Sequence, residues 1–404
     1  MEVKPGYKQT EVGVIPEEWD VRTMDSLTSL MTNGFVGTAT SAYVDSEDGV
    51  LYVQGYNVQE NGFNFHGIKR VSRSFHGRNQ KSRLRPGDLL TIQTGDIGVT
   101  AVVPPELAGA NCHALVISRF DERSSDSRFY CQYFNSERGR SKFKEIETGS
   151  TMKHLNVGDM KLLLLPSPPV EEQHAIAAAL SDVDALLGGL DRLIAKKREL
   201  KQAAMQQLLT GQTRLPGFSG AWEVKRLGEL AHIKTGSRNN EDKIADGEYP
   251  FFVRSEVVER INSYSHDCEA ILVPGEGRIG DIFHYINGRF DVHQRVYAIT
   301  QFKPTVSAKF VHLYMAMNFG AWAMQNTVKA TVDSLRLPTF QTFALLVPPT
   351  KDEQTAIAAV LSDMDSELAA LEARRDKTCD LKQAMMQELL TGKTRLVKPE
   401  AAHA

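Results

Sequence analysis

Two segments of the chain carry hydrophobic residues at alternating spacings of four and three positions. They are Ile176, Leu180, Val183, Leu187, Leu190 and Ile194 in the first segment and Ile357, Leu361, Met364, Leu368 and Leu371 in the second. This spacing places the apolar side chains along one face of a helix and is typical of a coiled-coil seam. Each segment follows two prolines, begins with acidic residues that suit the positive end of a helix dipole, and ends near a glycine. The pattern predicts two helices of about 40 residues, each roughly 60 Å long.

The two predicted helices should pack against each other through these seams. We expect the set Ile176, Leu180, Val183 and Leu187 to contact the set Leu361, Met364, Leu368 and Leu371. Gly188 and Gly189 interrupt the first helix, where a glycine costs roughly 1 kcal/mol relative to alanine. Their small size indicates the close approach of another backbone.

Outside these helices the chain shows short alternating or wholly apolar runs separated by Gly, Pro, Asn and Asp, which is typical of strands. The runs are residues 49–58, 88–98, 113–120, 249–258, 269–275, 281–286 and 294–300. A further helix is expected near the end of each block, at 128–145 and at 308–326. The chain is therefore predicted to be of the α+β class, with two mixed domains joined by helices.

The chain also contains an internal repeat. Residues 172–215 align without a gap to residues 353–396, and 26 of the 44 pairs are identical. Trp19, Val21 and Leu27 likewise match Trp222, Val224 and Leu230. Such self-similarity indicates a duplicated architecture. We predict a first domain at 1–169, a helical region at 170–215, a second domain at 216–350, a second helical region at 351–396 and a tail at 397–404.

The composition is that of a soluble globular chain and not of a general nucleic-acid coat. Of the 404 residues, 42% are hydrophobic and 24% are charged, and the net charge is -3 with a pI of about 6.4. No apolar run reaches the roughly 18 residues needed to cross a bilayer, so we expect a cytoplasmic protein with no membrane partner. The four cysteines form no CxxC pair and are expected to be free thiols.

Two similar domains held apart by similar helices suit a target with two separated parts. Double-stranded DNA is the natural candidate, because a two-fold-like protein reads two half-sites whose spacing mirrors its own geometry. The repeated helices would set that spacing, while the diverged domains would let the two half-sites differ. We therefore expect a bipartite, asymmetric DNA target.

The repeated motifs resemble those of the specificity subunits of type I restriction-modification systems. The matching segments are IPEEW at 15–19, PPVEEQHAIAAAL at 168–180, PPTKDEQTAIAAVL at 348–361 and the two LLTGxTRL ends at 208–215 and 389–396. The resemblance covers nearly the whole chain. It implies two pseudo-symmetric target-recognition domains separated by two long antiparallel helices that form a coiled-coil spacer.

The resemblance also implies a non-catalytic subunit of a larger enzyme. Its helical regions would bind two methyltransferase subunits through their remaining apolar faces, and two restriction and translocase subunits would join the complex. S-adenosylmethionine, ATP and magnesium would belong to those partners, and this chain would hold no cofactor of its own.

Two other functions stay open. A self-contained DNA methyltransferase or nuclease would need catalytic motifs, and neither an Asn-Pro-Pro-aromatic nor an Asp-Pro-Pro-Tyr sequence occurs. The run Gly392-Lys393-Thr394 approaches a phosphate-binding loop, but Gln387 stands where that loop needs a glycine. A coiled-coil scaffold that binds proteins is the second alternative, and it predicts no salt-dependent DNA binding.

Residues 61–85 carry seven basic side chains and no acid, which favours contact with DNA phosphates. The basic residues are Lys69, Arg70, Arg73, Arg78, Lys81, Arg83 and Arg85, and Asn79 and Gln80 add amides of the kind that read adenine. The alternative interpretation is a solvated basic loop. Phe63, Phe65 and Phe75 interleave this stretch and are expected to pack in the core.

In the second block arginine is the main candidate for reading guanine, because its guanidinium matches the acceptor pair of that base. The candidates are Arg254, Arg278, Gln294 and Arg295, and structural ion pairing is the alternative role for the arginines. The segments before the two di-prolines add Thr151, Lys153, His154, Lys329 and Thr331, whose alternative role is a capped turn. No histidine has the spacing of a metal ligand, so no metal site is predicted.

Overall fold

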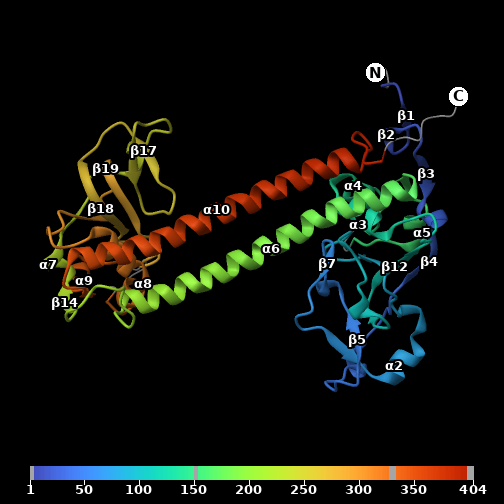
Figure 1. The fold of residues 1–404 in the computed structure, drawn as a ribbon, viewed down its shortest axis with the longest axis horizontal. Helices are drawn as coiled ribbons and strands as arrows, with labels where there is room; N and C mark the ends of the chain where they lie inside the picture. Colours follow the sequence, from blue (N-terminus) through green and yellow to red (C-terminus); the bar gives the residue numbers. More distant parts are fainter. Residues whose placement is uncertain (1–3, 150–152, 327–333, 398–404) are drawn as a thin grey trace. The chain divides into compact units, whose positions relative to one another are not determined.

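The computed structural model describes residues 4–149, 153–326 and 334–397 (Figure 1). The chain divides into two compact units. The first unit comprises Met1–Leu190 with Arg374–Ala404, and the second comprises Asp191–Ala373. Helix α6 (Val170–Leu209) and helix α10 (Lys351–Leu389) each contribute residues to both units. The first unit therefore needs the C-terminal end of the chain.

The first unit is built on small sheets. A four-stranded antiparallel sheet has the order β10 (Thr100–Val102), β9 (Leu89–Ile92), β12 (Leu115–Phe120) and β4 (Thr28–Asn33). A three-stranded sheet has the order β11 (Asn111–Cys112), β5 (Val50–Val53) and β8 (Lys69–Val71), with β11 and β5 parallel. Two-stranded pairs are β1 (Tyr7–Thr10) with β2 (Gly13–Pro16), β3 (Asp20–Thr23) with β13 (Leu164–Ser167), and β6 (Val58–Gln59) with β7 (Gly62–Phe63). The shorter helices are α1 (Met24–Leu27), α2 (Arg73–Arg78), α3 (Ser127–Asn135), α4 (Glu137–Ile146) and α5 (Val157–Lys161).

The second unit centres on a six-stranded sheet. Its order is β15 (His232–Thr235), β20 (Val296–Thr300), β18 (His266–Pro274), β19 (His284–Val292), β16 (Tyr249–Phe252) and β17 (Glu259–Ile261). Only β16 and β19 pair in parallel within this sheet. Strand β14 (Glu223–Arg226) pairs with β21 (Ala344–Val347), and the helices are α7 (Leu227–Leu230), α8 (Ala308–Asn326) and α9 (Leu337–Gln341). The helix predicted at 308–326 is confirmed as α8.

The helix predicted at 128–145 is instead two helices, α3 and α4. Ser136 adopts extended backbone between them, and its hydroxyl accepts the Gly139 N–H at 3.2 Å to cap α4. A Cβ at Gly139 would lie 2.1 Å from the carbonyl oxygen of Tyr133, so only glycine allows this tight junction. The break lets Phe134 of α3 stack on Phe143 of α4, with ring centroids 4.8 Å apart, inside the core of the unit.

The core of the second unit lies between the sheet and α8. Phe319 of α8 stacks on Phe340 of α9 and meets Phe343 edge-on, each with centroids 5.0 Å apart. Ile271 of β18 and Ile299 of β20 belong to the same cluster and are fully buried. Burial of these large side chains fixes the sheet against the helices and so positions the loops that join the strands.

The two long helices are confirmed and run antiparallel. In the first unit, Ile176 near the start of α6 packs in one cluster with Leu389 at the end of α10. In the second unit, Ile357 near the start of α10 packs with Leu208 near the end of α6. Each unit thus contains the start of one long helix and the end of the other.

The predicted contact between the two seams is wrong. The structure places Ile176 and Leu180 with Met385, Met386, Leu389 and Leu390, and places Ile357, Leu361 and Met364 with Met205, Leu208 and Leu209. In an antiparallel pair of similar length, equivalent positions of a repeat lie at opposite ends and cannot meet. A Cβ at Gly189 would have no described atom within 4 Å, so the close backbone approach is wrong at this glycine. For Gly188 it stays a prediction.

Ion pairs between the long helices follow the repeat. In the first unit, Lys382 Nζ lies 2.5 Å from Asp184, which also accepts a hydrogen bond from Gln132 Nε2 at 2.7 Å. In the second unit, the equivalent lysine, Lys201, pairs with the equivalent acid, Asp365. These aspartates therefore hold the two helices together.

Each long helix has a buried glutamate in its first turn, and this glutamate binds a tryptophan and an arginine. Glu172 accepts the Trp19 indole N–H at 2.9 Å and a bidentate pair from Arg395 at 2.6 and 2.8 Å. In the second unit the same arrangement is made by Glu353, Trp222 and Arg214. Each arginine comes from the segment that follows the other long helix. The end of one helix is thereby fastened to the start of the other.

Candidate nucleic-acid interface

Four loops of the second unit come together. We name them loop I (235–239, after β15), loop II (253–258, after β16), loop III (275–280, after β18) and loop IV (293–295, between β19 and β20). Arg238 of loop I forms a parallel β-bridge with His293 of loop IV. Gln294 Nε2 of loop IV donates to Asn239 Oδ1 of loop I. Residues far apart in the sequence therefore meet in one place.

Glu276 of loop III joins three of these loops. Its Oε2 lies 3.3 Å from Arg254 Nη1 of loop II, and its Oε1 lies 3.3 Å from Arg295 Nη1 of loop IV. Arg278 of loop III pairs with Glu256 of loop II, also at 3.3 Å. The three arginine side chains stay 50%, 59% and 61% exposed, so their remaining N–H groups are accessible. The structure thus gathers the predicted arginines, and it adds Glu276, which the sequence analysis missed.

His293 is buried in loop IV and has a defined tautomer. Its Nδ1 accepts the backbone N–H of Arg295 at 3.0 Å, so the proton of the neutral ring is on Nε2. Burial lowers the pKa of His293, and the charges of Arg254 and Arg295 lower it further. With Arg254 and Ser255, His293 lines a cavity of about 280 Å³. Donors around such a cavity suit the acceptor atoms of phosphates and base edges.

The first unit contains the same four loops. They are loop I (33–38, after β4), loop II (54–57, after β5), loop III (93–98, after β9) and loop IV (113–114, before β12). Phe35 bridges His113 in parallel, as Arg238 bridges His293. The backbone N–H of His113 donates to the carbonyl oxygen of Val53, the last residue of β5, at 2.8 Å. That of His293 donates to the carbonyl oxygen of Phe252, the last residue of β16, at 3.0 Å. The two histidines lie 180 positions apart, the offset that relates Pro168 to Pro348, so the repeat contained a signal for them.

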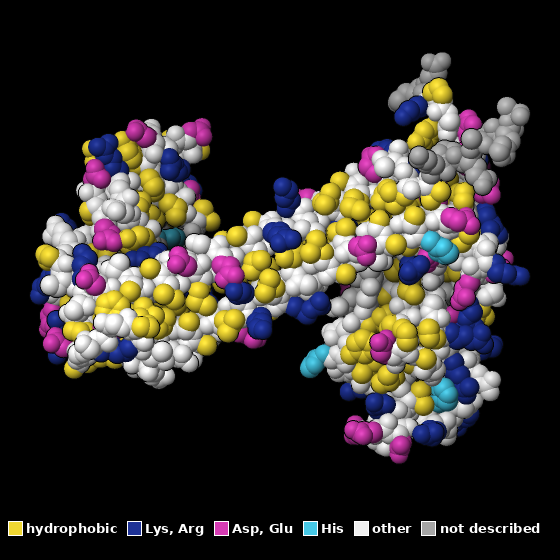
Figure 2. All heavy atoms as spheres, viewed as in Figure 1, with side chains coloured by type: hydrophobic (Ala, Val, Ile, Leu, Met, Phe, Trp, Pro, Cys, Tyr) yellow, Lys and Arg dark blue, Asp and Glu magenta, His cyan; other side chains and the backbone are white. Residues whose placement is uncertain are grey.

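The side chains on the two sets of loops differ. In the first unit the four loops contain no arginine or lysine, whereas in the second unit each of them contains an arginine. The cations of the first unit lie instead on the stretch predicted from the sequence, which forms β8, α2 and the turn after α2. Figure 2 shows Lys and Arg side chains gathered over the part of the first unit around α2.

Part of this basic stretch has free side chains. Lys69, Arg73, Arg78 and Lys81 are exposed and form no ion pair with any described residue. The side chain of Gln80 is exposed beside them. Long cationic side chains without acidic partners suit phosphate contacts, so these residues stay candidates for DNA binding.

Three other predicted residues of the stretch support local structure. Arg70 donates to the carbonyl oxygen of Gly49 at 2.7 Å, and Arg83 donates to that of His76 at 3.0 Å. Asn79 Nδ2 donates to the carbonyl oxygen of Phe75 at 2.8 Å and closes the end of α2. Much of the donor capacity of these side chains is used inside the unit.

The phenylalanines of the stretch differ in burial. Phe75 is buried and meets Phe35 edge-on at 4.9 Å, and Phe63 is partly buried against a core cluster. Phe65 is 45% exposed, so its predicted place in the core is wrong. Phe65 lies in the loop between β7 and β8, and its ring centroid is 6.5 Å from that of Phe63.

Two predicted residues before the first di-proline, Lys153 and His154, contact residues that follow α4. Lys153 Nζ lies 3.0 Å from Glu147 Oε2, and His154 exchanges two backbone hydrogen bonds with Thr148 at 3.1 and 2.9 Å. These contacts favour the capped-turn alternative. The predicted residues Thr151, Lys329 and Thr331 lie outside the described residues.

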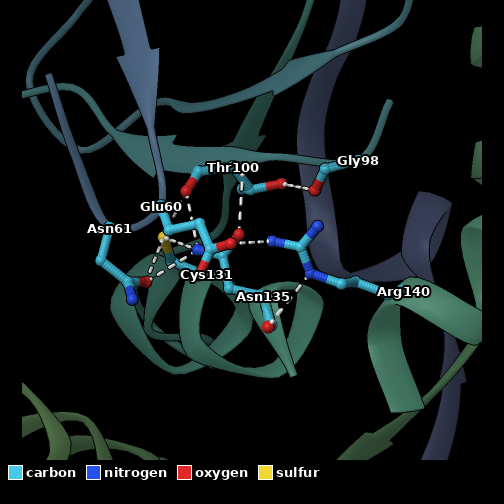
Figure 3. A network of polar contacts seen from close by, with 7 residues as sticks. All are labelled: Glu60, Asn61, Gly98, Thr100, Cys131, Asn135 and Arg140. Atoms are coloured by element: carbon cyan, nitrogen blue, oxygen red, sulfur yellow. Dashed lines mark hydrogen bonds and ion pairs between the residues drawn. The ribbon is translucent and has the colours of Figure 1, made fainter. Parts of the chain in front are cut away.

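A polar network anchors loop III of the first unit to α3 (Figure 3). Asn135 Nδ2 donates to the carbonyl oxygen of Thr100 at 2.8 Å, and Asn135 Oδ1 accepts the Thr100 N–H at 3.1 Å. The Thr100 hydroxyl donates to the carbonyl oxygen of Gly98, the last residue of loop III, at 2.9 Å. Burial raises the pKa of the neighbouring Cys131 thiol to about 12, so it stays protonated and donates to Asn61 Oδ1 at 3.3 Å. The network continues through Arg140, which donates to the carbonyl oxygen of Asn135 at 3.4 Å and pairs with Glu60. These connected contacts make the end of loop III rigid.

All four cysteines are free thiols, as predicted. Within the described ranges, no three side chains of His, Cys, Asp or Glu lie close enough together to hold a metal ion. Across the same ranges, no helix combines the length and the apolarity that crossing a bilayer requires.

Comparison with known proteins gives a consistent result. The family described as the type I restriction modification DNA specificity domain matches residues 16–199 and 220–378. The chain is 24% identical over 429 residues to a Methanocaldococcus jannaschii protein provisionally named the type I restriction enzyme MjaX specificity subunit, covering 96% of this chain and 97% of that protein. It is 28% identical over 170 residues to the type I restriction enzyme EcoDI specificity subunit of Escherichia coli, covering 42% and 37%.

A solved structure shares the fold. The S subunit of the type I restriction-modification system from M. genitalium superimposes with a TM-score of 0.65 at 16% identity, covering 96% of this chain and 98% of that one. A chain from a structure of a type I R-M system complex superimposes with a TM-score of 0.56 at 18% identity, covering 94% and 99%.

Proposed function

Because the chain belongs to the type I restriction-modification DNA specificity family, we propose that it reads a bipartite, asymmetric double-stranded DNA target, one half-site with each unit. The main support is that both units share one frame of four loops but carry different side chains on it. A shared frame suits docking against the same kind of groove, and different side chains suit different base sequences.

The long helices are proposed to set the gap between the half-sites and to bind the methyltransferase subunits. Helices α6 and α10 contain 40 and 39 residues and are each about 60 Å long. Helix α6 exposes Leu186, Leu193 and Leu200, which are 44%, 40% and 48% exposed. Their spacing of seven residues places them along one face of the helix, which suits packing against a helix of a partner subunit.

The chemistry is assigned to the partners. Two methyltransferase subunits would bring S-adenosylmethionine, and two restriction and translocase subunits would bring ATP and magnesium. The chain by itself is proposed to be non-catalytic. Purified chain incubated with S-adenosylmethionine and DNA should transfer no methyl group, and its DNA affinity should fall steeply with salt because it contacts phosphates. A chain that shows no salt-dependent DNA binding would support a protein scaffold instead.

Exchange of the second recognition block tests the proposal directly. We expect a map of N6-methyladenine, in a host that expresses the chain with its methyltransferase partner, to show a split motif with a constant gap. Residues 231–347 contain all four loops of the second unit. Replacing them by the corresponding block of another family member should change one half of the motif only. A change in both halves would contradict independent half-site recognition.

A further inference from the structure

Loop III has the same backbone in both units. Gly95 and Gly277 have φ angles of +87° and +91°. The N–H two residues later then donates back to the glycine carbonyl, from Ile97 at 2.8 Å and from Ile279 at 2.9 Å. This hydrogen bond closes a three-residue γ-turn. The central residue of the turn is Asp96 in the first unit and Arg278 in the second.

Both ends of the loop are held in equivalent ways. At the start of the loop, the backbone N–H of Leu155 donates to the carbonyl oxygen of Gln93 at 3.0 Å in the first unit. In the second unit, the backbone N–H of Leu335 donates to the carbonyl oxygen of Gly275 at 2.7 Å. At the end, Gly98 and Gly280 have φ angles of +85° and +76°. A Cβ at these two glycines would lie 2.7 Å from the ring of Phe143 and 2.6 Å from the Cα of Gly320 respectively. Each loop is therefore pressed against a helix, so the central side chain is the variable part of a rigid frame.

The central side chains have opposite charge. Asp96 is exposed, and its carboxylate has no hydrogen-bond or ion-pair partner among the described residues. Arg278 occupies the same position in the second unit, where Glu256 and Asp281 lie 3.3 and 3.6 Å from its guanidinium. A side chain without a partner on a rigid loop has its full hydrogen-bonding capacity available to a ligand.

We propose that Asp96 determines part of the sequence specificity of the first unit, by accepting a hydrogen bond from the exocyclic amino group of a cytosine or an adenine. This rests on the proposed function, because it requires the four loops to face DNA. In the major groove cytosine presents its N4 amino group and adenine its N6 amino group, whereas guanine and thymine present carbonyl oxygens at the same edge. A carboxylate accepts from an amino group and repels a carbonyl oxygen.

The same charge acts against non-cognate DNA. A carboxylate near the duplex is repelled by the phosphates, so it weakens binding to any sequence that offers no amino group to form a compensating hydrogen bond. Asp96 thus favours one half-site sequence and disfavours the others. In the second unit, Arg278 at the equivalent position offers donors, which suit guanine. The two units would then read bases of opposite hydrogen-bonding character through one loop geometry.

The test uses Asp96→Asn in the full chain with its methyltransferase partner. Asparagine has nearly the same shape, removes the charge and both accepts and donates, so it tolerates a carbonyl-bearing base. We expect the ratio of cognate to non-cognate affinity to fall on the order of 10-fold, with non-cognate duplexes bound as tightly as before or more tightly. The methylation map should lose its cytosine or adenine preference at one position of the first half-site. Duplexes with each of the four bases at that position identify which amino group is read.

Two control variants accompany this test. Glu122→Gln makes the same charge change at another exposed residue of the first unit, outside the four loops, and should leave the affinity ratio unchanged. Arg278→Gln should relax the second half-site only. If the wild-type map shows no two-part motif, the proposed function fails. If the wild-type motif is two-part and Asp96→Asn leaves it intact, or weakens all duplexes equally, Asp96 does not read a base and the inference is overturned.

Discussion

His312 of helix α8 has one ring nitrogen in a hydrogen bond and one that is sealed from solvent. Nε2 donates to the carbonyl oxygen of Phe283 at 3.3 Å, and Nδ1 is buried with no hydrogen-bond partner among the described residues. Burial lowers the pKa of His312, because a second proton would place an N–H on Nδ1 where it meets neither water nor an acceptor.

This lowered pKa makes part of the stability depend on pH. The unfolded chain binds a proton at His312 once the pH falls to about 6.5, while the folded chain does not, so acid favours unfolding below that pH and has no effect through this group above it. We expect the free energy of unfolding to fall between about pH 7.5 and pH 5.5. His312→Gln should make that fall smaller in urea denaturation. An identical fall in the variant would exclude His312 as a source.

At the scale of elements, two glycines at the long helices have different roles. Gly392 follows α10 with a φ angle of +69°, and a Cβ there would lie 2.5 Å from Pro16. Gly189 lies inside α6 and has open space where its Cβ would be. The first glycine is required by backbone conformation and close packing, whereas the second only weakens its helix.

Alanine at these two positions should therefore have opposite effects. Gly392→Ala should destabilise the first unit by more than about 1 kcal/mol, because it adds a clash with Pro16 to an unfavourable backbone conformation. Gly189→Ala should stabilise the isolated chain by about 0.5–1 kcal/mol through helix propensity. Urea denaturation of both variants measures these changes. Stabilisation by Gly392→Ala would contradict the assigned role of that glycine.

At the scale of the whole molecule, the two ends of the chain belong to one unit. Trp19 and Arg395 meet at the buried carboxylate of Glu172, and the first unit includes residues from 374 onward. In the second unit, the equivalent arginine, Arg214, forms a salt bridge with Glu353. Cutting the chain between its two recognition blocks would therefore separate the first block from part of its own core.

The paired arginines provide a matched test of this arrangement. Arg395→Ala leaves the Glu172 carboxylate buried without its cation, which should cost about 3–5 kcal/mol and raise hydrogen exchange in the first unit. Arg214→Ala should do the same in the second unit only. Lys393→Ala removes an exposed ion pair of 3.8 Å and should change stability by less than about 1 kcal/mol. Equal effects of Arg395→Ala on both units would show that the units do not unfold separately.

The local sequence was enough to predict the long helices, the helix at 308–326 and most strands, because hydrophobic periodicity and turn residues act over a few positions. The duplication and the α+β class also followed from it. Candidate residues such as Arg254 and Arg295 were found because arginine suits base edges whatever its surroundings.

The rest depended on contacts between distant parts of the chain. Sequence spacing could not show that Ile176 packs with Leu389. It also could not show that Arg70 and Arg83 donate hydrogen bonds to carbonyl oxygens of their own unit. The ion pairs of Glu276 with two arginines were likewise not visible in the sequence. Asp96 and Arg278 share a Gly-x-Ile-Gly sequence, but only the structure shows that each is the central residue of the same turn. The sequence alone determined which elements form and that they form twice. Only the tertiary structure decided their partners, because the free energy of packing depends on surfaces that folding brings together.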